Sequence, residues 1–250
     1  MYPRSLFYVF GQGINLYILF YGLGFVPAVV LGVAMARERG LALAPIVDAA
    51  WISILAALLG GPVLVVLVFR RLVPSLPLNW SFAQVLAVVA ALFAYNQVRR
   101  IDRARFGPRL DVLFPAAALY IACARVGCFT AGCCHGVPAW DLPWAVTFGD
   151  PASHSIYIGI PLHPTQLYEA GGCLGIAGLL YALRKRPFWY GRLAWAFMIA
   201  YGALRFSVEF WRGDIRPMVG ALSLAQAVCL GTVALGGAVL VYLSRLGTTD

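Results

Sequence analysis

The sequence predicts an all-α membrane protein of seven transmembrane helices, with its N-terminus outside, its C-terminus inside, and a folded extracytoplasmic loop between helices four and five. Three observations predict this class: the composition, the spacing of the apolar runs, and the distribution of Lys and Arg. Of the 250 residues, 62% are hydrophobic and 12% are charged, whereas soluble domains carry roughly 45–50% apolar and about 25% charged residues. Lipid is therefore the predicted solvent for most of the chain.

The apolar runs predict the individual spans. A bilayer core takes about 20 apolar residues in a helix, and a lipid-exposed backbone must satisfy its hydrogen bonds within the segment, which selects helices over open strands. Runs of suitable length lie at 14–36, 45–69, 78–97, 111–130, 164–183, 192–211 and 220–244. The first is too long for a signal peptide, and its positive charges follow it, so it is predicted to be a retained helix. No internal repeat is visible, and residues 1–250 are predicted to form a single domain.

The basic residues set the predicted orientation. With the N-terminus outside, the inner segments carry twelve Lys and Arg residues, counting Arg192 at the edge, and the outer segments carry five. This positive-inside bias places the C-terminus inside and the longest loop, about 131–163, outside. Four prolines in this loop favour a fixed conformation. The net charge of +9 is spread between spans instead of forming a stripe, which indicates the lipid bilayer as partner and no nucleic acid.

Two arginines within spans are the strongest functional signal. Arg125 and Arg205 lie one or two turns from the predicted outer surface, where a charge is costly unless it has a partner or a cavity. Glu209 follows Arg205 by four residues, so a structural ion pair is the alternative reading, whereas Arg125 has no partner in its own helix. Guanidinium groups bind phosphate bidentately, and both arginines are therefore predicted to hold an anionic lipid headgroup. Asp111, near a span end, is predicted to be an ordinary solvated interfacial charge.

Polar residues flank these arginines in three segments. Glycines at 127, 132 and 136 predict close approach or sharp turns where the fourth span ends. Thr165 or His163 is expected to cap the fifth helix, which also carries Glu169. In the sixth span, one helical face carries four polar residues at spacings of four, four and three: Tyr201, Arg205, Glu209 and Arg212. Such a stripe predicts a hydrated cavity.

A cluster of cysteines ends the fourth span and leaves several hypotheses open. It comprises Cys123, Cys128, Cys133, Cys134 and His135. The spacing matches no common structural zinc pattern, so no metal and no cofactor are assigned, although a metal site is one reading. A disulfide or redox role is another, without a Cys-x-x-Cys motif. The remaining alternatives are a cysteine nucleophile that carries an acyl or alkyl group and simple packing at a tight turn. The candidate residues for a thiol site are Cys128, Cys133 and Cys134. Cys173 and Cys229 lie in apolar runs and are predicted to be small buried hydrophobes.

The ordered motifs resemble a known family, the prolipoprotein diacylglyceryl transferases. These seven-span enzymes of the bacterial inner membrane move a diacylglyceryl group from phosphatidylglycerol to the thiol of a lipobox cysteine. The resemblance covers nearly the whole chain and rests on six pieces: Leu16-Tyr17-Ile-Leu-Phe-Tyr21, Gly60-Gly61, Arg125-Val-Gly-Cys-Phe129, Gly136 followed by Pro143-Trp-Ala-Val146, His163-Pro-Thr-Gln-Leu-Tyr-Glu169, and Tyr201-Gly-x-x-Arg205-x-x-x-Glu209-x-x-Arg212.

The resemblance implies roles for individual residues. Arg125 and Arg205 match the arginines that hold the lipid headgroup. The remaining matches, also assigned to the lipid site or its cavity, are Tyr17, Tyr201, Glu209 and Gly136. The chain departs from the family pattern at four positions: Pro62 stands for an arginine, Ala83 for a histidine, Cys128 for an asparagine and Cys133 for an acidic residue.

The implied reaction forms a thioether, which requires a thiolate, a positioned glycerol carbon and a stabilised phosphate leaving group. With Ala83 in place of the family's histidine, His163 is the first candidate for the base. The other catalytic candidates are His135, Glu169 and Glu209. The predicted partners are phosphatidylglycerol or a similar anionic lipid and a prolipoprotein signal peptide or another acceptor, at the bacterial plasma membrane with the site facing outward. The alternatives are a catalytically inactive relative that binds lipid or lipoprotein precursors, and a membrane thiol-redox or metal protein.

Overall fold

The computed structural model describes residues 6–9, 12–55, 106–216 and 218–245. The chain divides into two compact units, one formed by residues 1–34 and 110–250 and the other by 35–109. Among the described residues, the second unit contains the helix Ala44–Leu55, the end of the helix Phe25–Glu38 and the start of the helix Phe106–Ala131. Most of the motifs named above fall in the first unit.

The described residues are mainly helical, with three short β-hairpins or strand pairs. The helices are α1 (Leu16–Leu23), α2 (Phe25–Glu38), α3 (Ala44–Leu55), α7 (Phe106–Ala131), α8 (Thr165–Leu183), α9 (Leu193–Val208) and α10 (Leu224–Arg245), with 3₁₀ turns η4 (Pro187–Trp189) and η5 (Glu209–Trp211). The antiparallel strand pairs are β1 (Phe7–Val9) with β2 (Gln12–Ile14), β3 (Val146–Thr147) with β4 (Pro161–Leu162), and β5 (Met218–Val219) with β6 (Leu222–Ser223).

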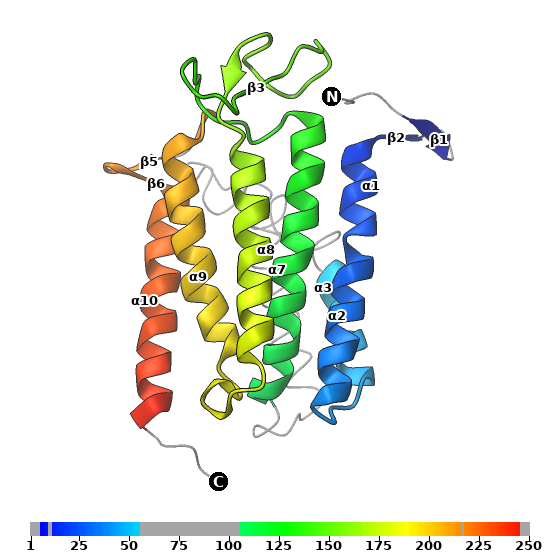
Figure 1. The fold of residues 1–250 in the computed structure, drawn as a ribbon, viewed down its shortest axis with the longest axis vertical. Helices are drawn as coiled ribbons and strands as arrows, with labels where there is room; N and C mark the ends of the chain where they lie inside the picture. The colour runs from blue at the N-terminus through cyan, green and yellow to red at the C-terminus, as the bar shows by residue number, and fades with distance from the viewer. Residues whose placement is uncertain (1–5, 10–11, 56–105, 217, 246–250) are drawn as a thin grey trace, which may run out of the picture. The chain divides into compact units, whose positions relative to one another are not determined.

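The helices of the first unit run side by side. In Figure 1, α7, α8, α9 and α10 form a row, and α1 lies on the other side of α7. The end of α7, the start of α8 and the end of α9 meet at the end of the unit where the loop between α7 and α8 lies, called here the loop end. The start of α1 lies at the same end, and α10 finishes at the opposite one. Residues from five segments are thereby brought to one end of the helices.

Four described helical segments are long and apolar enough to cross a membrane: Leu16–Glu38, Gly107–Ala131, Leu193–Trp211 and Leu224–Arg245. They correspond to the first, fourth, sixth and seventh predicted spans. The predicted fifth span is the helix α8, whose first turns carry buried polar side chains and which is not among the four. The second span is described only through α3, and the third lies outside the described residues. The structure is therefore that of a helical membrane protein, and the count of seven remains a prediction.

Local sequence signals explain how two helices begin. At the start of α10, Ser223 Oγ accepts from Gln226 N (3.1 Å) and Gln226 Oε1 accepts from Ser223 N (3.0 Å), which is a reciprocal capping box. The prediction for α8 was wrong: its N-cap is Pro164, and no side chain caps it. Thr165 and His163 form other hydrogen bonds, so the polar residues at the start of α8 bind the neighbouring loop and do not cap the helix.

Asp111 is not the solvated interfacial charge that the sequence suggested. Its side chain is fully buried, and its two oxygens accept hydrogen bonds from the backbone of the segment that starts α9, from Leu193 N at 2.7 Å and from Gly191 N at 2.6 Å. The first amides of a helix have no partner within it, and a carboxylate there also interacts favourably with the helix dipole. Asp111 therefore joins α7 to α9 at the end opposite the loop end.

We expect Asp111→Ala to lower the free energy of unfolding by about 2 kcal/mol, because buried amides left without an acceptor cost about 1–3 kcal/mol. Asp111→Asn keeps one acceptor oxygen and should lose about half as much. Unfolding in mixed micelles measures both. An alanine variant as stable as the parent chain would contradict the capping role.

Candidate functional site

The loop between α7 and α8 is folded around Gly136, as the prolines suggested. Gly136 N donates to His163 O (3.0 Å), His163 N donates to Val137 O (3.1 Å), and Val137 N donates to Trp211 O (2.9 Å). A Cβ atom at Gly136 would lie 2.4 Å from His163 O and 2.8 Å from Trp211 O. Glycine is therefore required where three segments, from the start of the loop, its end and the end of α9, come together.

We expect Gly136→Ala to destabilise the loop end by about 1–3 kcal/mol, the usual range for overpacking, because the obstructing atoms belong to backbone and cannot rotate away. Gly149→Ala in the same loop is the matched control, since a Cβ there meets no atom within 4 Å. Thermal unfolding of both variants in one detergent checks this. Equal melting temperatures would show that the three-segment junction is not tight.

Arg125 is held by a carboxylate from the neighbouring helix. Its Nη2 lies 3.0 Å from Glu169 Oε1 on α8, and the same oxygen accepts from the Tyr201 hydroxyl on α9 at 2.9 Å. Tyr201 also interacts electrostatically with Arg205. The arginine that had no partner in its own helix thus has one across the α7–α8 contact, and three helices meet at this carboxylate.

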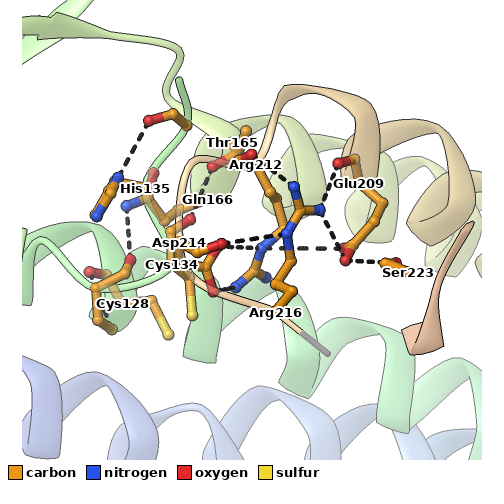
Figure 2. A network of polar contacts seen from close by, with 12 residues as sticks. Cys128, Cys134, His135, Thr165, Gln166, Glu209, Arg212, Asp214, Arg216 and Ser223 are labelled. Carbon is orange, nitrogen blue, oxygen red and sulfur yellow. Dashed lines mark hydrogen bonds and ion pairs between the residues drawn. The ribbon is translucent and has the colours of Figure 1, made fainter. Parts of the chain in front are cut away.

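Glu209 organises a second group of arginines, of which Figure 2 labels Arg212 and Arg216. One of its oxygens pairs with Arg205 and lies 4.0 Å from Arg212; the other accepts from Arg216 (2.8 Å) and from the Ser223 hydroxyl (2.9 Å). Arg212 in turn forks onto Asp214, with contacts of 2.8 and 2.5 Å. The predicted helical stripe therefore stops early: α9 ends at Val208, and Glu209 begins a 3₁₀ turn.

The carboxylates and the arginines differ in exposure. The side chains of Glu169 and Glu209 are 2% and 1% exposed, whereas those of Arg125 and Arg205 are 19% and 15% exposed. Four guanidinium groups (Arg125, Arg205, Arg212, Arg216) face three carboxylates (Glu169, Glu209, Asp214), so one positive charge of the described group is not matched by a carboxylate. The buried carboxylates hold the arginine side chains in place, and the side chains of Arg125 and Arg205 remain partly exposed to solvent.

Three cysteines in the last turn of α7 and just after it form a compact thiol turn, defined here as Cys128, Cys133 and Cys134. Their sulfur atoms lie within 4.8 Å of one another. Arg125 Nη1 donates to Cys134 Sγ at 3.7 Å, and the Tyr21 hydroxyl lies 3.5 Å from Cys128 Sγ. The ring of Tyr17 packs at a tilt of 42° against that of Tyr21, with ring centroids 4.6 Å apart, so α1 supplies an aromatic wall beside these thiols.

The charge state of the thiol turn follows from its contacts. The pKa of Cys134 is lowered from its ordinary value, first by hydrogen bonds from Cys128 and Cys133 and then, against the cost of burial, by the guanidinium groups of Arg212 and Arg125. The pKa of Cys133 is raised, because its thiol is hydrogen-bonded with Cys128 and Cys134 and is buried. These contacts favour the thiolate form at Cys134 over Cys133.

His135 and His163 occupy different surroundings. His135 is buried, with Nδ1 3.1 Å from Gly136 O and Nε2 accepting from Ile156 N at 3.4 Å. His163 Nδ1 lies 3.2 Å from the Tyr168 hydroxyl, which also accepts from Trp144 Nε1 (2.9 Å). His163 lines a pocket of about 440 Å³ together with Trp144, Tyr168, Leu204 and Trp211. His135 orders the loop, and His163 faces a space that an apolar molecule could fill.

Comparison with known proteins agrees with this arrangement. The family model of the prolipoprotein diacylglyceryl transferases matches residues 4–242. A phosphatidylglycerol–prolipoprotein diacylglyceryl transferase of Clostridium tetani is 32% identical over 92% of this chain and 94% of its own length. One from an Azoarcus species is 32% identical, covering 92% and 90% of the two chains, and a Clostridium perfringens relative is 27% identical over 95% and 94%. The chain belongs to the prolipoprotein diacylglyceryl transferase family.

Membership of this transferase family confirms the resemblance read from the motifs and the bacterial membrane class. The structure brings Arg125, Glu169, Tyr201 and Cys134 into one group, and Arg205 and Glu209 into a second that approaches it through Arg212. Gly136 serves the loop junction and His135 the loop interior. Pro62 and Ala83, two of the four departures from the family pattern, lie outside the described residues.

Sequence reasoning missed Arg216 and Ser223 as members of the site. A signal was present for the first. Arg212 and Arg216 are two of only five basic residues on the predicted outer side, where the positive-inside bias disfavours them. Arginines that lie on the outer side despite this bias indicate a local acidic partner, which the structure identifies as Glu209.

Proposed function

We propose that this chain transfers the diacylglyceryl group of phosphatidylglycerol, or of a similar anionic lipid, to the cysteine thiol of a prolipoprotein signal peptide. The observation that carries the proposal is that Arg125 and Arg205 are each fixed by a buried carboxylate and yet remain partly exposed at the loop end. The names of the relatives state the same substrates. With the family topology, the loop end would face outward from the plasma membrane, as part of one seven-span domain.

The arginines fit a lipid phosphate. A guanidinium group has five N–H donors, and the contacts to Glu169, Cys134 and Glu209 engage only part of this capacity. Tyr201, within electrostatic reach of both guanidinium groups, and Tyr17 would border the headgroup. Glu169 and Glu209 thus act as positioning residues.

The reaction forms a bond between the acceptor sulfur and a glycerol carbon of the lipid and breaks the bond between that carbon and the phosphate oxygen. Glycerol phosphate leaves with the electron pair, and its charge develops where the arginines lie. Such preorganised donors typically lower the barrier by about 3–4 kcal/mol each. The thiol proton must go to a base, and we assign it to His163, because His163 borders the pocket while His135, Glu169 and Glu209 are buried and engaged.

The direct test is transfer in vitro. The purified chain is mixed with vesicles that contain phosphatidylglycerol labelled in its acyl chains and with a signal peptide that carries a lipobox cysteine. We expect a labelled thioether product, and none with the serine analogue of the peptide. Complementation of a bacterium that lacks its own transferase gives an independent readout. Lipid binding without product in both assays would instead identify an inactive relative that binds lipid.

A further inference from the structure

The thiol turn has a geometry that the transfer reaction does not require. Three sulfur atoms, from Cys128, Cys133 and Cys134, converge at the end of α7 within 4.8 Å of one another. Two sulfurs would suffice for a disulfide, and one for a nucleophile. Three convergent sulfurs are the donor set of a thiophilic metal ion.

We propose that Cys128, Cys133 and Cys134 form a binding site for a divalent d¹⁰ cation such as Zn²⁺, held by three thiolates with a fourth position left for a ligand from outside the chain. The site stands on this geometry and does not depend on the transferase activity. Sulfurs around tetrahedral zinc lie about 3.8 Å apart, given Zn–S bonds of about 2.3 Å. Small side-chain rotations would bring the three sulfurs to that spacing.

The backbone of the thiol turn is held in a costly conformation. Cys134 has a φ of +58° and is the only non-glycine residue with positive φ in the part of the chain that is described. Gly132, two residues earlier, has a φ of +77°. A side-chain-bearing residue in this region costs of order 1 kcal/mol or more and persists only where the surroundings impose it. The turn accepts this cost while directing Cys134 Sγ back toward Cys128.

Two buried side chains from α8 impose that conformation. Thr165 Oγ1 donates to Cys134 O at 2.8 Å (Figure 2), and Gln166 Nε2 donates to Cys133 O at 2.7 Å. Both side chains are about 1% exposed. They hold the peptide groups of the two adjacent cysteines, so the sulfurs are preorganised by the neighbouring helix.

The sulfurs themselves have the outer contacts that metal ligands use. Second-shell donors orient ligands and tune their basicity. Arg125 Nη1 lies 3.7 Å from Cys134 Sγ, and the Tyr21 hydroxyl lies 3.5 Å from Cys128 Sγ.

Charge favours a divalent ion. Three thiolates with Zn²⁺ carry a net charge of −1, which the single positive charge in excess over the carboxylates of the surrounding group offsets. A monovalent ion would leave a charge of −2 at a site where uncompensated charge is expensive.

The fourth position suits a soft anionic donor. Three-ligand zinc sites commonly complete their coordination with water or an exogenous ligand. His135, the nearest histidine in sequence, is turned toward Gly136 and Ile156 and is not part of the sulfur cluster. Because Cys134 also contacts Arg125, a ligand in that position would lie close to this guanidinium group. An exogenous thiolate is the donor that matches both neighbours.

The test measures metal content and coordination in the full chain, purified in detergent under reducing conditions. We expect about one Zn²⁺ per chain after equilibration. Co²⁺ substitution should give thiolate charge-transfer and tetrahedral ligand-field bands, with the latter shifting when N-acetylcysteine methyl ester is added. Cys123→Ser, a cysteine of α7 outside the cluster, should retain all of these properties.

Cys134→Gly is the informative variant, because glycine removes the sulfur and relieves the positive φ. We expect it to reduce zinc affinity by at least tenfold while its metal-free form unfolds at no lower temperature than the parent chain. Unchanged zinc affinity in this variant would overturn the site. So would absence of zinc from the reduced parent chain, or recovery of the cluster as a disulfide that reduction does not convert to a zinc-binding form. A Co²⁺ spectrum insensitive to added thiol would overturn the open fourth position.

Discussion

Arg125→Ala should reduce diacylglyceryl transfer by about 10²–10³-fold, the effect typical of removing one preorganised donor to a developing oxyanion. The reason is geometric: Glu169 and Cys134 hold this guanidinium at the loop end, where water would otherwise have to reorganise around the leaving phosphate. Arg125→Lys should recover little, because a point charge cannot reproduce the fork. Initial rates with labelled phosphatidylglycerol measure the loss.

A structural effect must be separated from this loss, since Arg125→Ala leaves the buried Glu169 without its cation. The double variant Arg125→Ala with Glu169→Gln removes that buried charge and should restore stability without restoring transfer. Arg184→Ala, at the opposite end of α8, is the matched arginine control and should transfer at the parental rate. If the double variant regained full activity, the phosphate-binding role of Arg125 would be wrong.

The membrane class and the approximate helix positions could be predicted because they depend on composition and length. Hydropathy runs gave α7, α9 and α10 to within a few residues, apart from the start of α7, which lies at Phe106 and not at 111. The break between α1 and α2 at Gly24 falls inside one apolar run, so periodicity could not reveal it. The sixth span ends at Trp211 as predicted, but its last three residues form a 3₁₀ turn that the polar spacing does not reveal.

The candidate site was predictable as a set of residues but not as a set of contacts. Arg125 and Arg205 were singled out because charge in a span is expensive. Pairing between Arg125 and Glu169 depends on how α7 packs on α8, which one sequence does not encode locally. Asp111 shows the same limit: its position near a span end suggested solvation, whereas the start of α9 packs over it and takes both carboxylate oxygens.

The sequence predicted only part of the arrangement of the cysteine cluster. Proximity of Cys133, Cys134 and His135 in sequence suggested a common site, yet the positive φ of Cys134 sends its sulfur back to Cys128, and the ring of His135 lies against Gly136 and Ile156. Spacing rules for metal sites assume regular turns. The left-handed backbone conformation of Cys134 departs from a regular turn, and this conformation is visible only in the structure. The Ser223–Gln226 capping box, by contrast, was readable as Ser-x-x-Gln and was overlooked.

Glu209→Ala should be the most destabilising single substitution at the loop end, lowering the free energy of unfolding by about 3–5 kcal/mol, the range for breaking a buried ion pair from one side. Its side chain is 1% exposed and contacts Arg205, Arg216 and Ser223. Alanine would leave these guanidinium groups facing one another with no shared anion. Unfolding in mixed micelles measures the loss, and Asp141→Ala, an exposed carboxylate on the adjoining loop, should change stability by less than about 0.5 kcal/mol.

The partner of Glu209 that matters most can be identified by a double-mutant cycle. Arg216 reaches Glu209 twice, through its carboxylate at 2.8 Å and its backbone oxygen at 2.7 Å, and comes from the segment after η5. Combining Glu209→Ala with Arg216→Ala should therefore cost less than the sum of the single variants, by a coupling of about 0.5–3 kcal/mol. Strict additivity would mean that the Arg216 side chain does not depend on Glu209 and that Arg205 alone neutralises the buried carboxylate. The contacts of Glu209 with Arg205 and with Arg216 would then be independent of each other.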